Sequence, residues 1–218
     1  MGLSAKRLTT EQLQARLRND CPTSQRSASD QVRTNQWTFD ALRGVLTELS
    51  SQGGQGQLSL AFSLVLNAQR QKETVAWVTD SHSSFFPPDV AAAGIDLQAL
   101  AVIRLPGVRN QLKGADRLVR SGGFGLVVLD LGADPRVPAA LVARLAGLAK
   151  KHDTVVLCLT EKRRDTSSLG ARVSVRGEAH RTSHHDGLYT CRINVFRDRR
   201  HGQGWVHEEV LRGPPGLG

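Results

Sequence analysis

The sequence predicts an α/β domain built on a mostly parallel sheet with helices on both faces. Short apolar runs alternate with amphipathic stretches of helical length through the middle of the chain, which is the pattern of repeated strand–helix–strand units. The composition is aliphatic, since hydrophobic residues make up 39% of the 218 and aromatic residues only 5%. A chain of this length has room for one such domain with extensions.

The chain is expected to fold in three parts. Thr9, as an N-cap with Gln12 three residues later, predicts a helix to about residue 18. The following stretch, residues 19–35, is polar with almost no apolar side chains, which is typical of a flexible linker. The predicted parts are an N-terminal helix and linker over residues 1–36, a folded domain over residues 37–200, and a last strand with a disordered tail over residues 201–218.

Within the folded domain, apolar runs predict the strands and longer amphipathic stretches predict the helices. The predicted strands cover residues 44–49, 75–79, 101–105, 125–130 and 154–160, and helices are expected from Leu58 onward and over residues 111–121 and 138–151. Strands that alternate with helices in this way form right-handed units and a parallel sheet covered on both faces. Short antiparallel strands are expected around residues 173–176, 189–196 and 205–211, as hairpins that extend the sheet.

A glycine-rich turn containing Gly53, Gly54 and Gly56 joins the first strand to the first amphipathic helix. A phosphate loop occupies such a turn: its backbone N–H groups face the phosphates, a lysine holds the β and γ phosphates, and a Ser or Thr hydroxyl binds Mg²⁺. Here Gln57 stands at the lysine position and Leu58 at the hydroxyl position. A plain glycine turn between strand and helix is the alternative interpretation.

These two replacements remove the side chains that handle charge. A neutral Gln57 cannot offset a triphosphate, because charge-assisted hydrogen bonds contribute roughly 1.5–3 kcal/mol against about 1 kcal/mol for neutral ones. Leu58 cannot ligate magnesium, which requires oxygen ligands. Asp130 ends a predicted apolar strand, which is typical of the Walker B strand of such proteins. We therefore expect a nucleotide-loop remnant, no ATPase activity and no cofactor.

In this order the segments resemble the RecA family of recombinases, from about residue 44 to residue 200. The resemblance runs through the Glu48 strand, residues 93–97, residues 118–122 and the Asp130 strand. It implies an acidic residue after the second strand, where this chain has Ser81, and a γ-phosphate-sensing Gln, where it has Glu161. Together with Gln57 and Leu58, four ATP-handling positions thus depart from the family pattern.

A closer resemblance is to ImuA-like proteins, the RecA-related accessory factors of damage-induced mutagenesis. It rests on residues 75–80, 85–88, 91–97 and 120–122. It implies a catalytically inactive RecA-like adaptor in SOS-induced translesion synthesis, with RecA, a Y-family-like polymerase subunit and an error-prone replicative-type DNA polymerase as partners. The alternatives are a SulA-like cell-division inhibitor of RecA ancestry and, disfavoured by the loop, an active ATPase of circadian-clock or recombination-accessory type.

The charge and the family resemblance predict where DNA would bind. The net charge of +9 and the pI of about 10.3 favour polyanionic partners. The resemblance implies two DNA loops, residues 131–137 and residues 161–171, and a basic strip at the end of a late strand. The predicted DNA-binding residues are Lys162, Arg163, Arg164, Arg197, Arg199 and Arg200, for which a solvated run of charges is the alternative. The predicted partner-binding residues are Leu8, Leu13 and Leu17, on one side of the N-terminal helix.

Other sequence patterns do not indicate a metal site or a catalytic site. His180, His184, His185 and Cys191 match no standard zinc spacing, so no metal is expected. Asp80, Ser81 and His82 are adjacent residues whose side chains diverge, which disfavours nucleophilic catalysis. The odd number of cysteines, three, and the absence of a long apolar segment predict a protein of the reducing cytoplasm. The DNA and RecA partners that the resemblance implies would associate it with the nucleoid.

Overall fold

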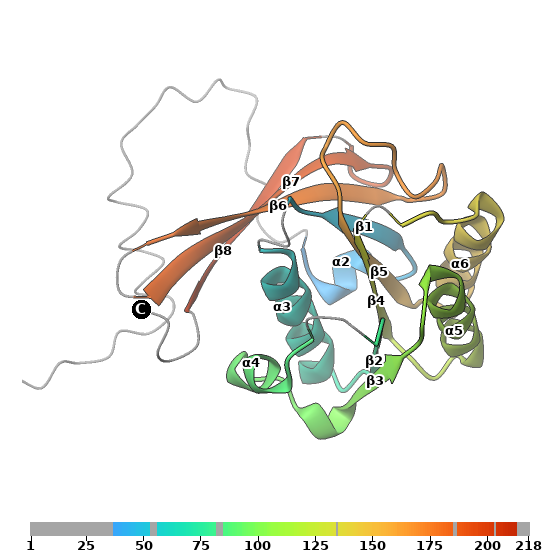
Figure 1. Ribbon diagram of the computed structural model, residues 1–218, viewed down its shortest axis with the longest axis horizontal. Helices are drawn as coiled ribbons and strands as arrows, with labels where there is room; N and C mark the ends of the chain where they lie inside the picture. Colours follow the sequence, from blue (N-terminus) through green and yellow to red (C-terminus); the bar gives the residue numbers. More distant parts are fainter. Residues whose placement is uncertain are drawn as a thin grey trace, which may run out of the picture. The chain divides into compact units, whose positions relative to one another are not determined.

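The computed structural model describes residues 37–52, 56–81, 85–133, 135–184, 187–202 and 204–212, which form a single sheet with helices on both faces (Figure 1). In chain order the elements are α2 (Phe39–Leu42), β1 (Leu46–Ser50), α3 (Gln57–Arg70), β2 (Val75–Thr79), α4 (Pro87–Ala92), the 3₁₀ turn η1 (Leu97–Ala99), β3 (Leu100–Arg104), α5 (Val108–Ser121), β4 (Leu126–Ala133), α6 (Ala139–His152), β5 (Val155–Glu161), β6 (Val175–Ser183), β7 (Leu188–Asp198) and β8 (Trp205–Arg212). None of the described helices is long and apolar enough to cross a membrane.

The eight strands follow the order β3-β2-β4-β5-β1-β6-β7-β8. Every pairing from β3 to β6 is parallel, and β7 pairs antiparallel with both β6 and β8. The predicted fold class, a mostly parallel sheet with antiparallel C-terminal strands, is confirmed. Because parallel strands end at the same edge of a sheet, the turns after β1, β4 and β5 meet at one edge.

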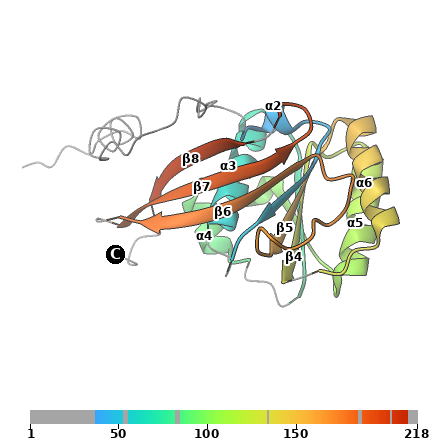
Figure 2. The same ribbon diagram turned by 90° about the horizontal axis from the view of Figure 1, so that it is seen from above.

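Each central strand is buried on both faces and serves two separate apolar cores. Val75 and Trp77 of β2 join the core beneath α2, α3 and α4, whereas Ala76 and Val78 join the core beneath α5 and α6. This alternation follows from the two-residue period of a strand. Figure 2 shows α5 and α6 together on one side of the sheet.

The antiparallel strands are longer than the sequence predicted. The first of them was expected over residues 173–176, but β6 runs over Val175–Ser183, with its first five residues buried and its last four exposed. The exposed half is polar and gives no apolar signal, yet its pairing with β7 continues to Ser183 opposite Tyr189. Figure 2 shows this hairpin, joined by β8, extending beyond the helices. Cross-strand hydrogen bonds therefore hold a strand that hydrophobicity alone does not mark.

Candidate nucleotide-loop remnant and nucleic-acid interface

The glycine-rich turn lies between β1 and α3, as predicted. Gly53 and Gly54 are outside the described residues. Gly56 is the N-cap of α3 in the left-handed region, with φ +86°, and a Cβ there would lie 3.1 Å from the backbone oxygen of His180. Glycine is needed for both reasons, since other residues rarely adopt this φ. The turn is thus pressed against β6.

At the start of α3, the side chains at the two chemically decisive positions face inward. Gln57 is 4% exposed, and its Oε1 has no hydrogen-bond partner among the described residues. Leu58 packs against the apolar core beneath α3. The hydroxyl of the next residue, Ser59, lies 3.3 Å from the hydroxyl of Tyr189 on β7. These two positions therefore offer neither a cation nor a hydroxyl group.

Two aspartates at this edge take part in contacts within the fold. Asp130 of β4 is half-buried and accepts a hydrogen bond of 3.0 Å from the Thr79 hydroxyl at the end of β2. Asp80 accepts hydrogen bonds from the N–H of Gly107, at 2.8 Å, and from the hydroxyl of Ser81, at 3.1 Å. Asp80 thereby holds the turn that starts α5, and His82 lies outside the described residues.

A buried carboxylate that the sequence analysis treated only as part of a strand organises the loop after β5. Glu48 of β1 is fully buried, with Lys162 Nζ 3.7 Å and Arg176 Nε 3.6 Å from its oxygens. It also accepts hydrogen bonds from the Ser168 hydroxyl at 2.6 Å and the Leu169 N–H at 3.0 Å. A charged residue within an apolar strand was the available signal, because buried charges are paired. Glu48 therefore fixes residues 162–169 against the sheet.

The three cations predicted to contact DNA in this loop do not act alike. Lys162 is 7% exposed and donates to the backbone oxygen of Ser167, so its ammonium group points inward to Glu48 rather than outward to a phosphate. The Arg163 side chain is 72% exposed, beside Asp165. Arg164 lies over the ring of Phe196, 5.4 Å from its centre. The outward cations of this loop are thus Arg163 and Arg164.

These two arginines border an open groove of about 460 Å³. Its lining residues are Gln52, Arg163, Arg164, Asp165 and Glu178. Glu178 is buried, and its Oε2 lies 3.5 Å from His180 Nε2. The groove joins the nucleotide-loop remnant to the loop after β5, and it is lined by both signs of charge.

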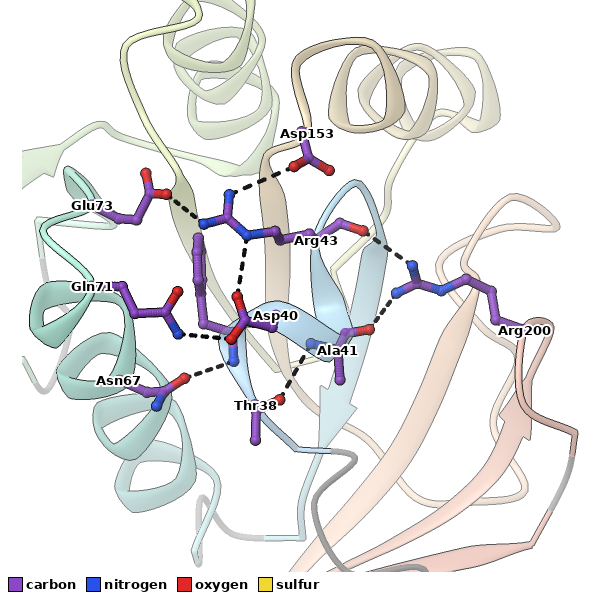
Figure 3. A network of polar contacts seen from close by, with 10 residues as sticks. Thr38, Asp40, Ala41, Arg43, Asn67, Gln71, Glu73, Asp153 and Arg200 are labelled. Carbon is purple, nitrogen blue, oxygen red and sulfur yellow. Dashed lines mark hydrogen bonds and ion pairs between the residues drawn. The ribbon is translucent and has the colours of Figure 1, made fainter.

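The predicted basic strip at the end of β7 divides between two places. Arg197 and Arg199 both donate to the backbone oxygen of Ala171, at 3.1 Å and 2.6 Å, beside the loop after β5. Burial, then the neighbouring cations Arg199 and Arg176, lowers the pKa of Arg197. Arg200 instead donates to the backbone oxygens of Ala41 and Arg43 at α2 (Figure 3). Only the first two can act together with the loop.

Arg43 is the centre of the contacts drawn in Figure 3. Its guanidinium group lies 2.6 Å from Glu73, 3.4 Å from Asp40 and 3.6 Å from Asp153, and above the ring of Phe39. The hydrogen bond with Glu73 contributes most to raising the pKa of Arg43. This cluster ties α2 to the ends of α3 and α6, so its role is structural.

The described histidines and the cysteine that were considered as metal ligands are not brought together. His180 is exposed on β6, His184 bonds the Thr190 hydroxyl at 2.7 Å, and Cys191 is buried in the core beneath α3. No set of three metal-ligating side chains occurs among the residues the structure describes, and His185 is not among them. Leu8, Leu13 and Leu17 also lie outside the described residues.

The sheet order, the glycine turn after β1 and the position of Asp130 within β4, which continues past it to Ala133, are consistent with a RecA-like α/β fold. The chain is similar to RecA proteins: that of Fusobacterium nucleatum is 25% identical over 56% of this chain and 37% of its own length, and that of Chlorobium chlorochromatii 24% over 56% and 39%. RecA of Nocardioides sp. is 35% identical over 40% of this chain and 25% of its own length. No protein-family model matches the chain. The chain is RecA-related, and the matches span about two fifths or less of these relatives.

Proposed function

We propose that this chain is a RecA-related adaptor that associates with DNA and lacks ATPase activity. The observation that carries the proposal is the start of α3, where Gln57 is buried at the lysine position and Leu58, at the magnesium position, is partly buried and packs against the core. In such loops the lysine holds the β and γ phosphates and the hydroxyl binds Mg²⁺, and both of these side chains are replaced here. An adaptor needs the surfaces of the fold but not its nucleotide chemistry.

The charges around the turn support this proposal. Glu178 pairs in register with Ser50 at the end of β1 and is buried, and Glu161 ends the neighbouring β5. A triphosphate there would meet carboxylates without the lysine that offsets its charge. Loss of one charge-assisted hydrogen bond alone costs roughly 1.5–3 kcal/mol of binding. We therefore expect at most millimolar affinity for ATP.

Among RecA-related proteins, the motifs at residues 75–80, 85–88, 91–97 and 120–122 favour the ImuA-like accessory factors. On this basis we propose a role in SOS-induced translesion synthesis, with RecA, a Y-family-like polymerase subunit and an error-prone replicative-type polymerase as partners. Arg163 and Arg164, with Arg197 and Arg199 beside them, are the proposed DNA contacts. Arginines at a loop suit phosphate contact without sequence readout.

The proposed lack of ATPase activity is tested by phosphate release and by the thermal shift with Mg²⁺ and ATP. We expect no turnover above a buffer blank and no rise in melting temperature, because no described side chain of the turn offsets the triphosphate charge. Asp130→Ala is the control for contaminating enzyme. Turnover that is lost in Asp130→Ala would overturn the proposal.

The proposed DNA association is tested by anisotropy with single-stranded oligonucleotides of several sequences. Arg163→Gln with Arg164→Gln should weaken binding to every sequence and lower the salt slope by roughly 1.4, or about 0.7 per lost phosphate contact. Arg70→Gln with Arg212→Gln removes the same charge from distant exposed positions and serves as the control. Lys162 stays unchanged because its removal would leave Glu48 unpaired.

Equal losses in both variants would overturn the assignment of the loop. Absence of DNA binding in the unaltered chain, together with arrest of cell division on expression, would favour the SulA-like alternative instead.

A further inference from the structure

The two helix layers carry very different charge. The sequences of α5 and α6 contain seven lysine or arginine residues and one carboxylate, Asp116, a formal balance of +6. Those of α2, α3 and α4 contain one arginine and two aspartates, a balance of −1. The layer of α5 and α6 therefore carries a formal charge of +6, which equals two thirds of the net charge of +9 of the whole chain.

Three of these cations form a line along α5. Arg109, Lys113 and Arg117 are exposed and follow each other at intervals of four residues, about 6 Å along the helix, so they share one side of it. Among the described residues, no carboxylate lies within ion-pair distance of any of the three. By contrast, Arg120 and Arg144 both bind Asp116, at 2.8 Å and 2.5 Å. We call Arg109, Lys113 and Arg117 the α5 stripe.

The α5 stripe opposes the stability of its own helix. Like charges four residues apart destabilise a helix by roughly 0.2–0.5 kcal/mol per pair. Arg109 also lies in the first turn of α5, where the helix dipole disfavours a cation. Because no described carboxylate offsets these costs, the stripe does not stabilise the fold, and its three cations are available to an anionic ligand.

A shallow hollow of about 270 Å³ lies on the stripe. Its lining residues are Leu105, Pro106, Asn110, Lys113, Gly114 and Arg117. A Cβ on Gly114 would lie 2.5 Å from Leu105 Cδ1, so the glycine allows the leucine to pack against the helix. The hollow thus combines apolar residues with two cations, which suits a phosphate and its adjoining sugar.

We propose that the α5 stripe and this hollow bind the phosphodiester backbone of a nucleic acid without reading its sequence. The inference extends the proposed DNA association to a second surface, separate from the loop after β5. Evenly spaced cations on a straight helix match a ligand whose negative charges also repeat regularly, as phosphates do along a strand. Carboxylates on a protein surface have no such fixed repeat.

The test compares two charge-matched variants of the full chain on the same layer. Lys113→Gln with Arg117→Gln should weaken binding of a fluorescent oligothymidylate and lower its salt slope by roughly 1.4. Lys150→Gln with Lys151→Gln removes the same charge from α6 and should have less than half this effect. The α5 variant should melt no lower than the unaltered protein, because it removes like-charge repulsion and glutamine has about the same helix propensity as lysine and arginine.

A local measurement separates a site from general attraction. Acetylation of lysines, followed by mass spectrometry, should show Lys113 protected by the oligonucleotide and Lys150 and Lys151 little protected. Equal effects of the two variants, or an unprotected Lys113, would overturn the α5 stripe. So would polyglutamate that protects Lys113 as well as the oligonucleotide does, since the surface would then suit an acidic polypeptide.

The variant Arg163→Gln with Arg164→Gln distinguishes a failure of the α5 stripe from a failure of the loop assignment. If it loses DNA while Lys113 stays unprotected, the stripe is wrong and the loop assignment stands. If it retains DNA while the α5 variant loses it, the loop assignment is wrong and the stripe stands.

Discussion

Asp198 shows how one residue can hold a turn that carries several arginines. Its carboxylate, at the end of β7, accepts hydrogen bonds from the N–H groups of Arg200 and His201 and, at 2.9 Å, from the indole of Trp205. Burial by itself raises the pKa of Asp198, but the hydrogen bonds from Arg200, Trp205 and His201 outweigh it and lower the pKa below its ordinary value. The charged form is therefore the one that the fold stabilises.

This lowered pKa predicts a loss of stability in acid. The contribution of Asp198 is complete above the pKa of the unfolded chain, near 3.9, and is lost as pH falls through the lower folded value. Asp198→Asn should unfold more easily at neutral pH and show a flatter decline of unfolding free energy below about pH 4. Urea unfolding across this range measures both effects. An unchanged acid slope in the variant would contradict the assignment.

Glu48 allows a second prediction for a single residue. Glu48→Gln leaves Lys162 and Arg176 buried without their counter-ion, which we expect to cost about 3–5 kcal/mol of unfolding free energy. Glu208→Gln, which breaks a half-exposed ion pair with Arg192, should cost less than about 1 kcal/mol. If urea unfolding shows comparable losses of unfolding free energy in the two variants, the buried cluster stabilises the fold no more than an exposed ion pair does.

For the individual elements, the sequence predicted what depends on local pattern. The strand over residues 75–79 was predicted with the observed bounds, because its apolar run is continuous and buried on both faces. The short helix α4 was not predicted, since it begins at consecutive prolines and has only six residues. The inward turn of Lys162 was also beyond prediction, because its partner Glu48 is brought near only by the pairing of β1 with β5.

Two glycines in comparable helices should respond oppositely to alanine. Gly147 lies within α6, where an added Cβ would meet no neighbouring side chain or element within 4 Å, so Gly147→Ala should stabilise the protein by up to about 1 kcal/mol. Gly122 ends α5 at φ +71°, and Gly122→Ala should cost about 1–2 kcal/mol because the left-handed conformation is strained for alanine. Thermal and urea unfolding of the two variants measure the difference. A shift of the same sign in both would contradict this account.

For the whole molecule, the sequence predicted the sheet class and the turn between β1 and α3 but not the distribution of charge. Residues 45–160 carry 11 basic and 9 acidic side chains and look nearly neutral when summed along the chain. Folding separates them, because the amphipathic α5 and α6 place their cations on the outer side of one layer. Such a separation depends on which helices share a face, and a count along the sequence averages it away.

The predicted N-terminal helix can be tested by deleting it from the whole chain. Deletion of residues 1–35 should leave the melting temperature unchanged, because the described cores are built from residues 37 onward. The same deletion should abolish co-purification with RecA or the polymerase subunit if Leu8, Leu13 and Leu17 form the contact. Three apolar side chains contribute roughly 1.5–3 kcal/mol each before ordering costs, so micromolar affinity is expected. A truncated chain that unfolds, or that keeps full partner binding, would contradict the adaptor role of the helix.

The unequal charge of the two helix layers also amounts to an electric dipole directed across the sheet, from the α2, α3 and α4 side to the α5 and α6 side. In the field of a polyanion, a molecule with such a dipole turns its positive side forward before contact. Encounters then occur in the productive orientation more often than by chance, and the association rate constant rises. This gain in the association rate constant shrinks as the Debye length falls to about 3 Å near 1 M salt. At low salt, the α5 and α6 layer should therefore raise the association rate constant as well as the affinity for a polyanion.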